Sequence, residues 1–182
     1  RFETDPDIVW DTSSVNDMDS MFESARSLTS VPFYWDVSSV TSMSRMFQGA
    51  DNYRPEAFSD WNTANVKDFS FTFAMLDPYS SEYWGIGGHW QGQERYINVH
   101  SWETSSATTM EGMFANDPFL YINSAEFSNW DVSNVQNMDS MFAGCSNFVG
   151  TNSGMEVWNT SQVTSMNSMF GNAVNFAGNL AS

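Results

Sequence analysis

Apolar side chains recur in a fixed register along this chain of 182 residues. Six tryptophans mark the register, and successive members are 25, 26, 41, 28 and 28 residues apart: Trp10, Trp35, Trp61, Trp102, Trp130 and Trp158. Self-similarity at such a period is typical of repeat proteins, in which each unit buries its apolar face against its neighbours. The sequence therefore predicts a single domain over residues 1–182, made of six repeats.

A constant pattern follows each tryptophan. An acid or amide comes first, then Thr or Val, then a small polar pair that leads to two methionines and a phenylalanine. In the second repeat, Val40, Met43, Phe47 and Ala50 have offsets of 0, 3, 7 and 10, and Ser39 stands where a cap would, which favours a short helical segment. Apolar and polar residues alternate over 31–38, which favours a strand.

These two elements define the expected fold class. We predict an α/β repeat fold, a leucine-rich-repeat-like solenoid with one short parallel strand and one short helical segment per coil. A unit of this length cannot cover its own apolar face, so ladders of Trp, Met and Phe are expected inside the stack. The third repeat is degenerate, with Phe69 and Thr72 at the two methionine positions.

Two motifs carry a resemblance to a known family. They are W-D-V-S-S-V-T-S-M-S-R-M-F-Q-G-A (Trp35 to Ala50) and W-D-V-S-N-V-Q-N-M-D-S-M-F-A-G-C (Trp130 to Cys145). The chain resembles the BspA-like leucine-rich-repeat surface proteins, and their Met- and Phe-rich subfamily, common in mycoplasma lipoproteins and other microbial surface proteins. The resemblance covers nearly the whole chain, apart from the third repeat and its insertion. It implies a secreted or surface-anchored adhesin and supplies no catalytic residues.

Composition narrows the partners. Six basic residues stand against 22 acidic ones, for a net charge of −16, so nucleic acid and anionic membrane surfaces are disfavoured as partners. No apolar run is long enough to insert into a membrane. The one cysteine, Cys145, excludes an intrachain disulfide and stands in a column of small residues, which indicates an inert buried thiol.

The long spacing between Trp61 and Trp102 contains an insertion at about 78–98 that breaks the register. Insertions in repeat proteins emerge as loops on one face, and loops carry function more often than core columns do. We predict a ligand-binding surface for extracellular protein or glycan from its aromatic and polar residues: Tyr83, Trp84, His89, Trp90, Arg95 and Tyr96. The alternative is a loop that folds back and plugs the gap left by the degenerate repeat.

Two further columns have competing interpretations. The acids and amides after each tryptophan (Asp11, Asp36, Asn62, Glu103, Asp131 and Asn159) line Ca²⁺ in one reading and brace turns in the other, which we favour. No other cofactor is expected. The Thr/Val column that follows forms a flat surface ladder in one reading and reflects ordinary β-propensity in the other.

The sequence predicts a non-enzymatic adhesion or ligand-binding module, located outside the cell or on its surface. His89 and His100 lie in no catalytic motif, although Glu82 and Glu94 leave a glycan-processing enzyme as an alternative. A purely structural spacer is a third interpretation. The shortest observed spacing places a seventh tryptophan just after Ser182, so we expect a fragment of a larger protein that continues into further repeats.

Overall fold

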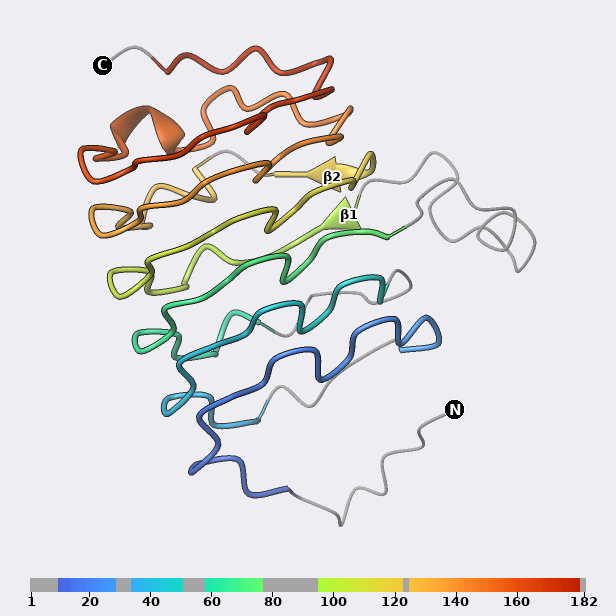
Figure 1. Cartoon of the computed structure of the whole chain (residues 1–182), viewed down its shortest axis with the longest axis vertical. Helices are drawn as coiled ribbons and strands as arrows, with labels where there is room; N and C mark the ends of the chain where they lie inside the picture. The colour runs from blue at the N-terminus through green and yellow to red at the C-terminus, as the bar shows by residue number, and fades with distance from the viewer. Residues whose placement is uncertain (1–9, 29–33, 51–57, 77–94, 123–124, 181–182) are drawn as a thin grey trace.

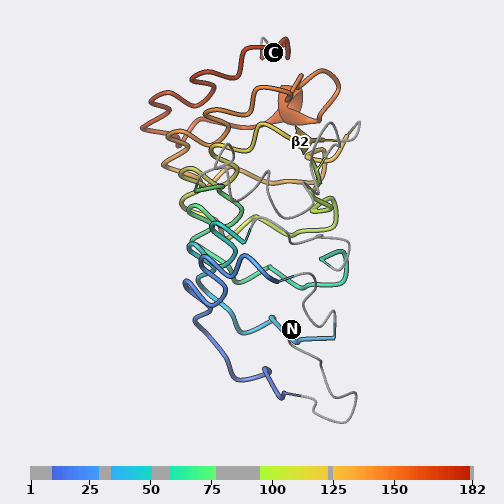
Figure 2. The same ribbon diagram turned by 90° about the vertical axis from the view of Figure 1, so that its right-hand side faces the viewer.

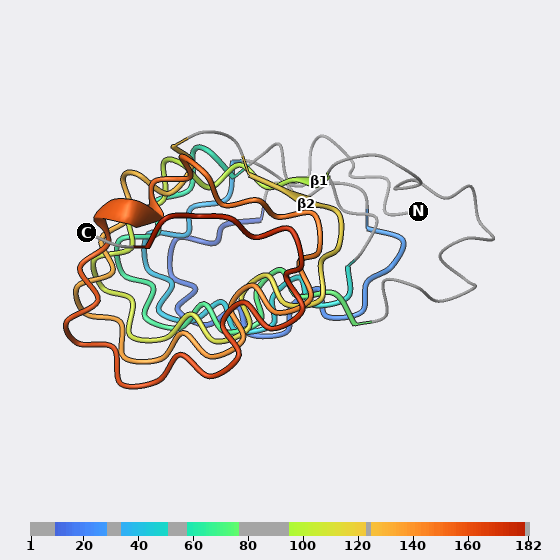
Figure 3. The same cartoon turned by 90° about the horizontal axis from the view of Figure 1, so that it is seen from above.

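The chain rises in six stacked layers, one for each tryptophan of the repeat. The computed structural model describes residues 10–28, 34–50, 58–76, 95–122 and 125–180. The first layer lies at the bottom of Figure 1 and the sixth at the top, and the view down the stack shows successive layers following nearly the same path (Figure 3). One ladder of parallel bridges joins all six layers: Asp17, Ser42, Asp68, Thr109, Asn137 and Ser165.

The predicted fold class is wrong. The described residues contain no α-helix, and their regular elements are two short strands and one short 3-10 helix. Strand β1 covers Arg95–Tyr96, strand β2 covers Leu120–Tyr121, and the two pair in parallel; the 3-10 helix η1 covers Met155–Val157. The chain is therefore not an α/β repeat solenoid with a strand and a helical segment in every coil. It is a stack of linked turns (Figure 2).

Alternating hydrogen bonds explain why no helix forms after the tryptophan. In the second layer, the Met43 and Arg45 N–H groups donate to carbonyls of the third layer, whereas the Met46 N–H donates to the Met43 carbonyl. An α-helix needs every N–H for the carbonyl four residues back. Arg45 (φ 55°) and Gly49 (φ 68°) are also left-handed, which interrupts any helix. Linked turns thus produce the spacing that the sequence analysis assigned to a helical face.

The strand predicted over 31–38 is not formed at residues 34–37, although their side chains alternate between exposed and buried. Trp35 and Val37 are buried, whereas Tyr34 and Asp36 are exposed. Residues 34–37 nevertheless form no strand, and 31–33 lie outside the described residues.

The apolar columns do face inward, as the repeat pattern predicted. The phenylalanines that follow the methionine positions, one in each layer, form one continuous stacked ladder. Neighbouring ring centroids are 5.4–5.8 Å apart in the order Phe22, Phe47, Phe73, Phe114, Phe142, Phe170. The four inner members are fully buried, and so are the methionines at the two repeat positions of the second, fourth and fifth layers. Burial of aromatic and thioether side chains supplies the main stabilisation of the stack.

In the first five layers the Thr/Val column lies inside the stack and not on its surface, whereas Thr160 of the sixth layer is exposed. The hydroxyls of Thr12, Thr63 and Thr104 donate to the carbonyls of Asp36, Glu103 and Asp131 in the next layer, each at 2.9 Å. Val37 and Val132 are buried at the same position. The interpretation as a flat surface ladder is therefore wrong, because this column joins neighbouring layers.

Candidate functional site

Only some of the predicted ligand-binding residues belong to the part of the chain that the structure describes. Tyr83, Trp84, His89 and Trp90 lie outside the described residues, so the choice between a binding loop and a plug stays open. Arg95 and Tyr96 are described, and they form β1 at the end of the insertion.

Arg95 is turned into the interior. It is paired in register with Leu120 of β2, and its backbone N–H donates to the Phe119 carbonyl at 2.8 Å. Arg95 thus lies directly beside Leu120, which is fully buried. Its side chain is only 1% exposed, so Arg95 presents no guanidinium donor to a ligand in solution.

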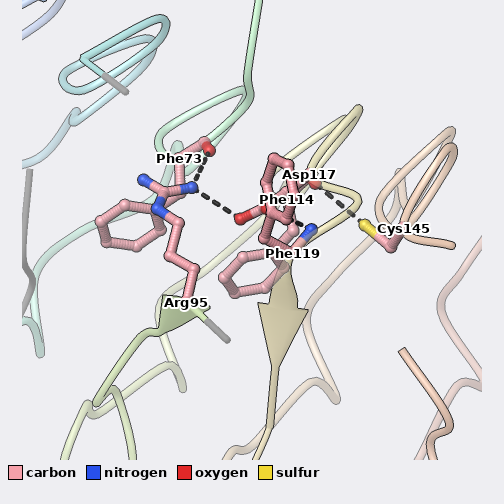
Figure 4. Close-up of polar contacts among 6 residues, drawn as sticks. All are labelled: Phe73, Arg95, Phe114, Asp117, Phe119 and Cys145. Carbon is pink, nitrogen blue, oxygen red and sulfur yellow. Dashed lines mark hydrogen bonds and ion pairs between the residues drawn. The ribbon is translucent and has the colours of Figure 1, made fainter. Parts of the chain in front are cut away.

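The guanidinium of Arg95 meets a carboxylate in this interior position. Its Nη1 lies 2.6 Å from Oδ2 of Asp117 and donates to the Phe73 carbonyl at 3.3 Å (Figure 4). The second carboxylate oxygen of Asp117 accepts the backbone N–H of Phe119 at 3.0 Å. Burial raises the pKa of Asp117, while the charge and hydrogen bonds of Arg95 oppose that rise. The pair anchors the end of the insertion to the third and fourth layers.

Cys145 occupies the same repeat position as Asp117, one layer further along. The thiol is fully buried and donates to the Phe114 carbonyl at 3.0 Å (Figure 4). Burial raises the pKa of Cys145 well above its ordinary value, so the thiolate that a nucleophile requires is disfavoured. The predicted burial of this thiol is confirmed.

Tyr96 turns outward from β1 and meets a second tyrosine. Its ring centroid lies 4.6 Å from that of Tyr121 on β2, with an angle of 54° between the rings. The two side chains are 46% and 37% exposed. Val149, in register with Tyr121 in the next layer, is also exposed. An apolar surface column therefore begins at the end of the insertion, with its first residue held in place by the buried neighbour Arg95.

Tyr121 and Val149 were missed in the sequence analysis. Tyr96 and Tyr121 are 25 residues apart, and only the pairing of β1 with β2 brings them together. A signal was present, because Tyr121 and Val149 each follow the large apolar residue that ends the repeat motif, Leu120 or Phe148.

The acid and amide column braces turns. In every layer the side chain accepts the backbone N–H of the residue two positions later, as Asp36 does from Ser38 at 2.9 Å and Asp131 from Ser133 at 2.9 Å. These hydrogen bonds lower the pKa of Asp36 and of Asp131, with the Ser38 and Ser133 side chains as the largest cause. Within the described ranges no three His, Cys, Asp or Glu side chains are grouped so as to hold a metal ion. Turn bracing is confirmed, and Ca²⁺ binding has no supporting geometry there.

The described histidine and the buried acids have structural partners. The ring of His100 contacts the Ala125 carbonyl (3.2 Å) through Nδ1 and the Asn129 amide (3.0 Å) through Nε2. The buried carboxylate of Glu126 accepts the Val99 N–H at 2.7 Å. Glu82 and Glu94 lie outside the described residues, so the enzymatic alternative keeps its status as a hypothesis.

Comparison with known proteins places the chain in a family. In the part of the chain that the structure describes, no helix is long and apolar enough to span a bilayer. No curated protein and no solved structure matches the chain. One family profile matches residues 2–85 and 87–182. Because that match covers nearly all of the sequence, the chain belongs to the family described as Mycoplasma protein of unknown function, DUF285.

Proposed function

We propose that this chain is a non-enzymatic adhesion or ligand-binding module of a secreted or cell-surface protein. The observation that carries the proposal is the exposed pair Tyr96 and Tyr121, held on paired strands at the end of an aromatic-rich insertion. The resemblance of the repeat to BspA-like surface proteins supports the same role.

The tyrosine pair suits recognition because its backbone is rigidly held. Arg95, the residue before Tyr96, is tied to both Asp117 and the Phe73 carbonyl. An exposed aromatic on a fixed strand loses little conformational freedom when a ligand packs against it. Tyrosine also offers an apolar ring face together with a hydroxyl, a combination that is enriched at binding surfaces.

Charge narrows the class of ligand. A net charge of −16 repels polyanions, which leaves neutral glycans and proteins with neutral or basic surfaces. Three further aromatic residues of the insertion, Tyr83, Trp84 and Trp90, are close in sequence to Tyr96. We therefore propose an extracellular glycan or protein as the partner.

Binding to glycan and matrix-protein arrays tests this function. The double variant Tyr96→Ala/Tyr121→Ala is expected to lose at least tenfold in affinity for any ligand that the wild-type chain binds, with an unchanged melting temperature. Tyr34→Ala, at a similarly exposed tyrosine elsewhere in the stack, is the matched control and is expected to bind normally.

A second pair of substitutions tests whether the insertion and the tyrosine pair belong to the same binding site. Trp84→Ala/Trp90→Ala is expected to weaken the same ligand if both surfaces form one site. Polysaccharide turnover that depends on Glu82 or Glu94 would contradict the proposal in favour of an enzyme. Absence of binding on every array would favour a structural spacer.

A further inference from the structure

One side of the stack carries an exposed column of three side chains, Tyr96, Tyr121 and Val149. We call this surface the tyrosine face. The first two residues belong to β1 and β2, which lie side by side (Figure 1). The Ala177 N–H donates to the Val149 carbonyl at 2.8 Å, so the chain continues past Val149 and the column belongs to the side of the stack. With neighbouring strands about 4.8 Å apart, the column runs for about 10 Å along the stack.

The described part of the tyrosine face has no exposed charge. Residues 96–99, 118–122 and 146–153 contain no charged side chain, although the whole chain carries −16. Arg95 and Asp117, which adjoin two of these segments, are buried against each other. By contrast, the acids that follow the tryptophans are exposed. A ligand on the tyrosine face therefore meets a neutral surface on a strongly acidic protein.

Two asparagines flank the column. Exposure alternates residue by residue over 95–99, which places Asn98 on the same side of the chain as Tyr96. Exposed Asn147 likewise stands two residues before Val149, with a buried residue between them. Both ends of the column thus have a side-chain amide beside them.

These two amides are not used by the fold. Neither Asn98 nor Asn147 has a side-chain hydrogen bond among the described residues. Asparagines of the regular repeat differ, since Asn65 and Asn134 donate to carbonyls of the preceding layer at 2.7 and 2.8 Å. The amides of the tyrosine face therefore have both donor and acceptor capacity left for a ligand.

We infer that the tyrosine face binds a neutral glycan. The inference rests on the proposed binding function and names the class of its ligand. A sugar ring presents C–H groups on one face and hydroxyls around its rim. The C–H face stacks on an exposed tyrosine ring, and the hydroxyls pair with side chains that both donate and accept, as asparagine amides do. Because the two amides lie at opposite ends of the column, the ligand is a chain of sugars that lies along the stack.

A protein partner fits the tyrosine face less well. A stable protein interface covers about 800 Å² on each partner and has an apolar core. The exposed apolar side chains of the column are two tyrosines and one valine, with amides beside them. The face also lacks the charges that steer protein partners together. These features favour the neutral glycan.

Calorimetric titration of the 182-residue chain tests the ligand class. The probes are neutral oligosaccharides of glucose, galactose and mannose, each compared with a carboxymethylated form of the same chain. At least one neutral probe is expected to bind, and its carboxymethylated form is expected to bind more weakly. Affinity for the neutral probe is expected to stay within about twofold from low to high ionic strength, because no charge takes part in the contact.

Substitutions on the tyrosine face test the location. Asn98→Ala and Asn147→Ala are each expected to weaken binding about fivefold at an unchanged melting temperature, because each removes one hydrogen bond to the ligand. Asn16→Ala is the matched control. Asn16 is also exposed and has no side-chain hydrogen bond among the described residues, but it lies away from the tyrosine face and is expected to have no effect.

The outcomes separate this inference from the proposed function. Binding only to proteins or to acidic glycans overturns the neutral glycan and leaves a binding module. Neutral-glycan binding that depends strongly on salt, or that survives both asparagine substitutions and Tyr96→Ala/Tyr121→Ala, overturns the tyrosine face as its site. No binding to any glycan or protein overturns both the inference and the proposed function.

Discussion

Arg95 and Asp117 form an ion pair at 2.6 Å in a place where both side chains are almost wholly removed from water. Removing one partner leaves the other charge buried without compensation, which costs about 3–5 kcal/mol. We therefore expect Asp117→Ala to lower the free energy of unfolding by that amount in a denaturant titration. The double variant Arg95→Leu/Asp117→Ala is expected to recover much of the loss, because no charge remains inside. Asp60→Ala, at an exposed site, is the control. Equal losses of stability for Asp117→Ala and Asp60→Ala would contradict the role of the ion pair as an anchor.

The phenylalanine ladder makes a position-dependent prediction. Phe142 is fully buried and stacks on both Phe114 and Phe170, whereas Phe22 ends the ladder and is half-buried. Phe142→Ala is expected to destabilise the chain by about 3–5 kcal/mol, as truncation of a core aromatic does. Phe22→Ala makes the same chemical change at the end of the ladder and is expected to cost clearly less. A loss at Phe22 as large as that at Phe142 would argue against the ladder.

Acid should weaken the stack through its turn and interlayer carboxylates. Hydrogen bonds lower the pKa of Asp11, mainly through the Ser13 side chain, and that of Asp139, mainly through Ser165. A carboxyl whose pKa is lower in the folded state stabilises the fold above its unfolded-state pKa. That contribution is lost as the pH falls through the folded-state pKa.

Stability is therefore expected to fall as the pH drops below about 4, the ordinary pKa of an aspartate. Asp139 also accepts the Asn167 N–H, at 2.6 Å, so it ties the sixth layer to the fifth. Asp139→Asn is expected to lower stability at neutral pH and to flatten the acid limb of the melting temperature plotted against pH. Asp60→Asn is the control. An unchanged acid limb in Asp139→Asn would contradict the assignment.

Gly154 is held where only glycine fits. Its φ is 96°, and a Cβ there would lie 2.4 Å from the backbone nitrogen of Ser128 in the preceding layer. Because that neighbour is backbone, it has little freedom to move aside, and Gly154→Ala is expected to cost about 1–3 kcal/mol. Gly171→Ala has no positive φ and a nearest contact of 3.2 Å, so it is expected to cost much less. Thermal melting of both variants checks the difference.

The inward columns could be predicted from the sequence, whereas the backbone between them could not. Burial of Met138 and Phe142 follows from repetition alone, since a short repeat must cover its apolar side chains with its neighbours. Three-residue spacing, however, is shared by a helical face and by linked turns. The deciding signal was the column in which Gly49, Asn116 and Gly144 recur, because these residue types accept the left-handed conformation found there.

Of the two exposed tyrosines, Tyr96 could be predicted as a site residue from the sequence and Tyr121 could not. Tyr96 belongs to an insertion and stood out by breaking the register. Tyr121 lies in a regular repeat and becomes notable only because β1 pairs with β2. The inward orientation of Arg95 could not be predicted from the sequence either. It depends on Asp117, which stands at a repeat position where most other layers have a small residue.

Parallel registration of the layers is the central claim, and an engineered disulfide tests it most directly. In a Cys145→Ala background, Asn137→Cys and Ser165→Cys place two thiols on bridged residues of neighbouring layers. Paired strands lie about 4.8 Å apart, within the Cα separation that a disulfide spans. Mild oxidation is expected to join this pair within one chain in high yield. The shifted pair Asn137→Cys and Asn167→Cys, two residues out of register, is expected to join poorly, and equal yields for the two pairs would contradict the account.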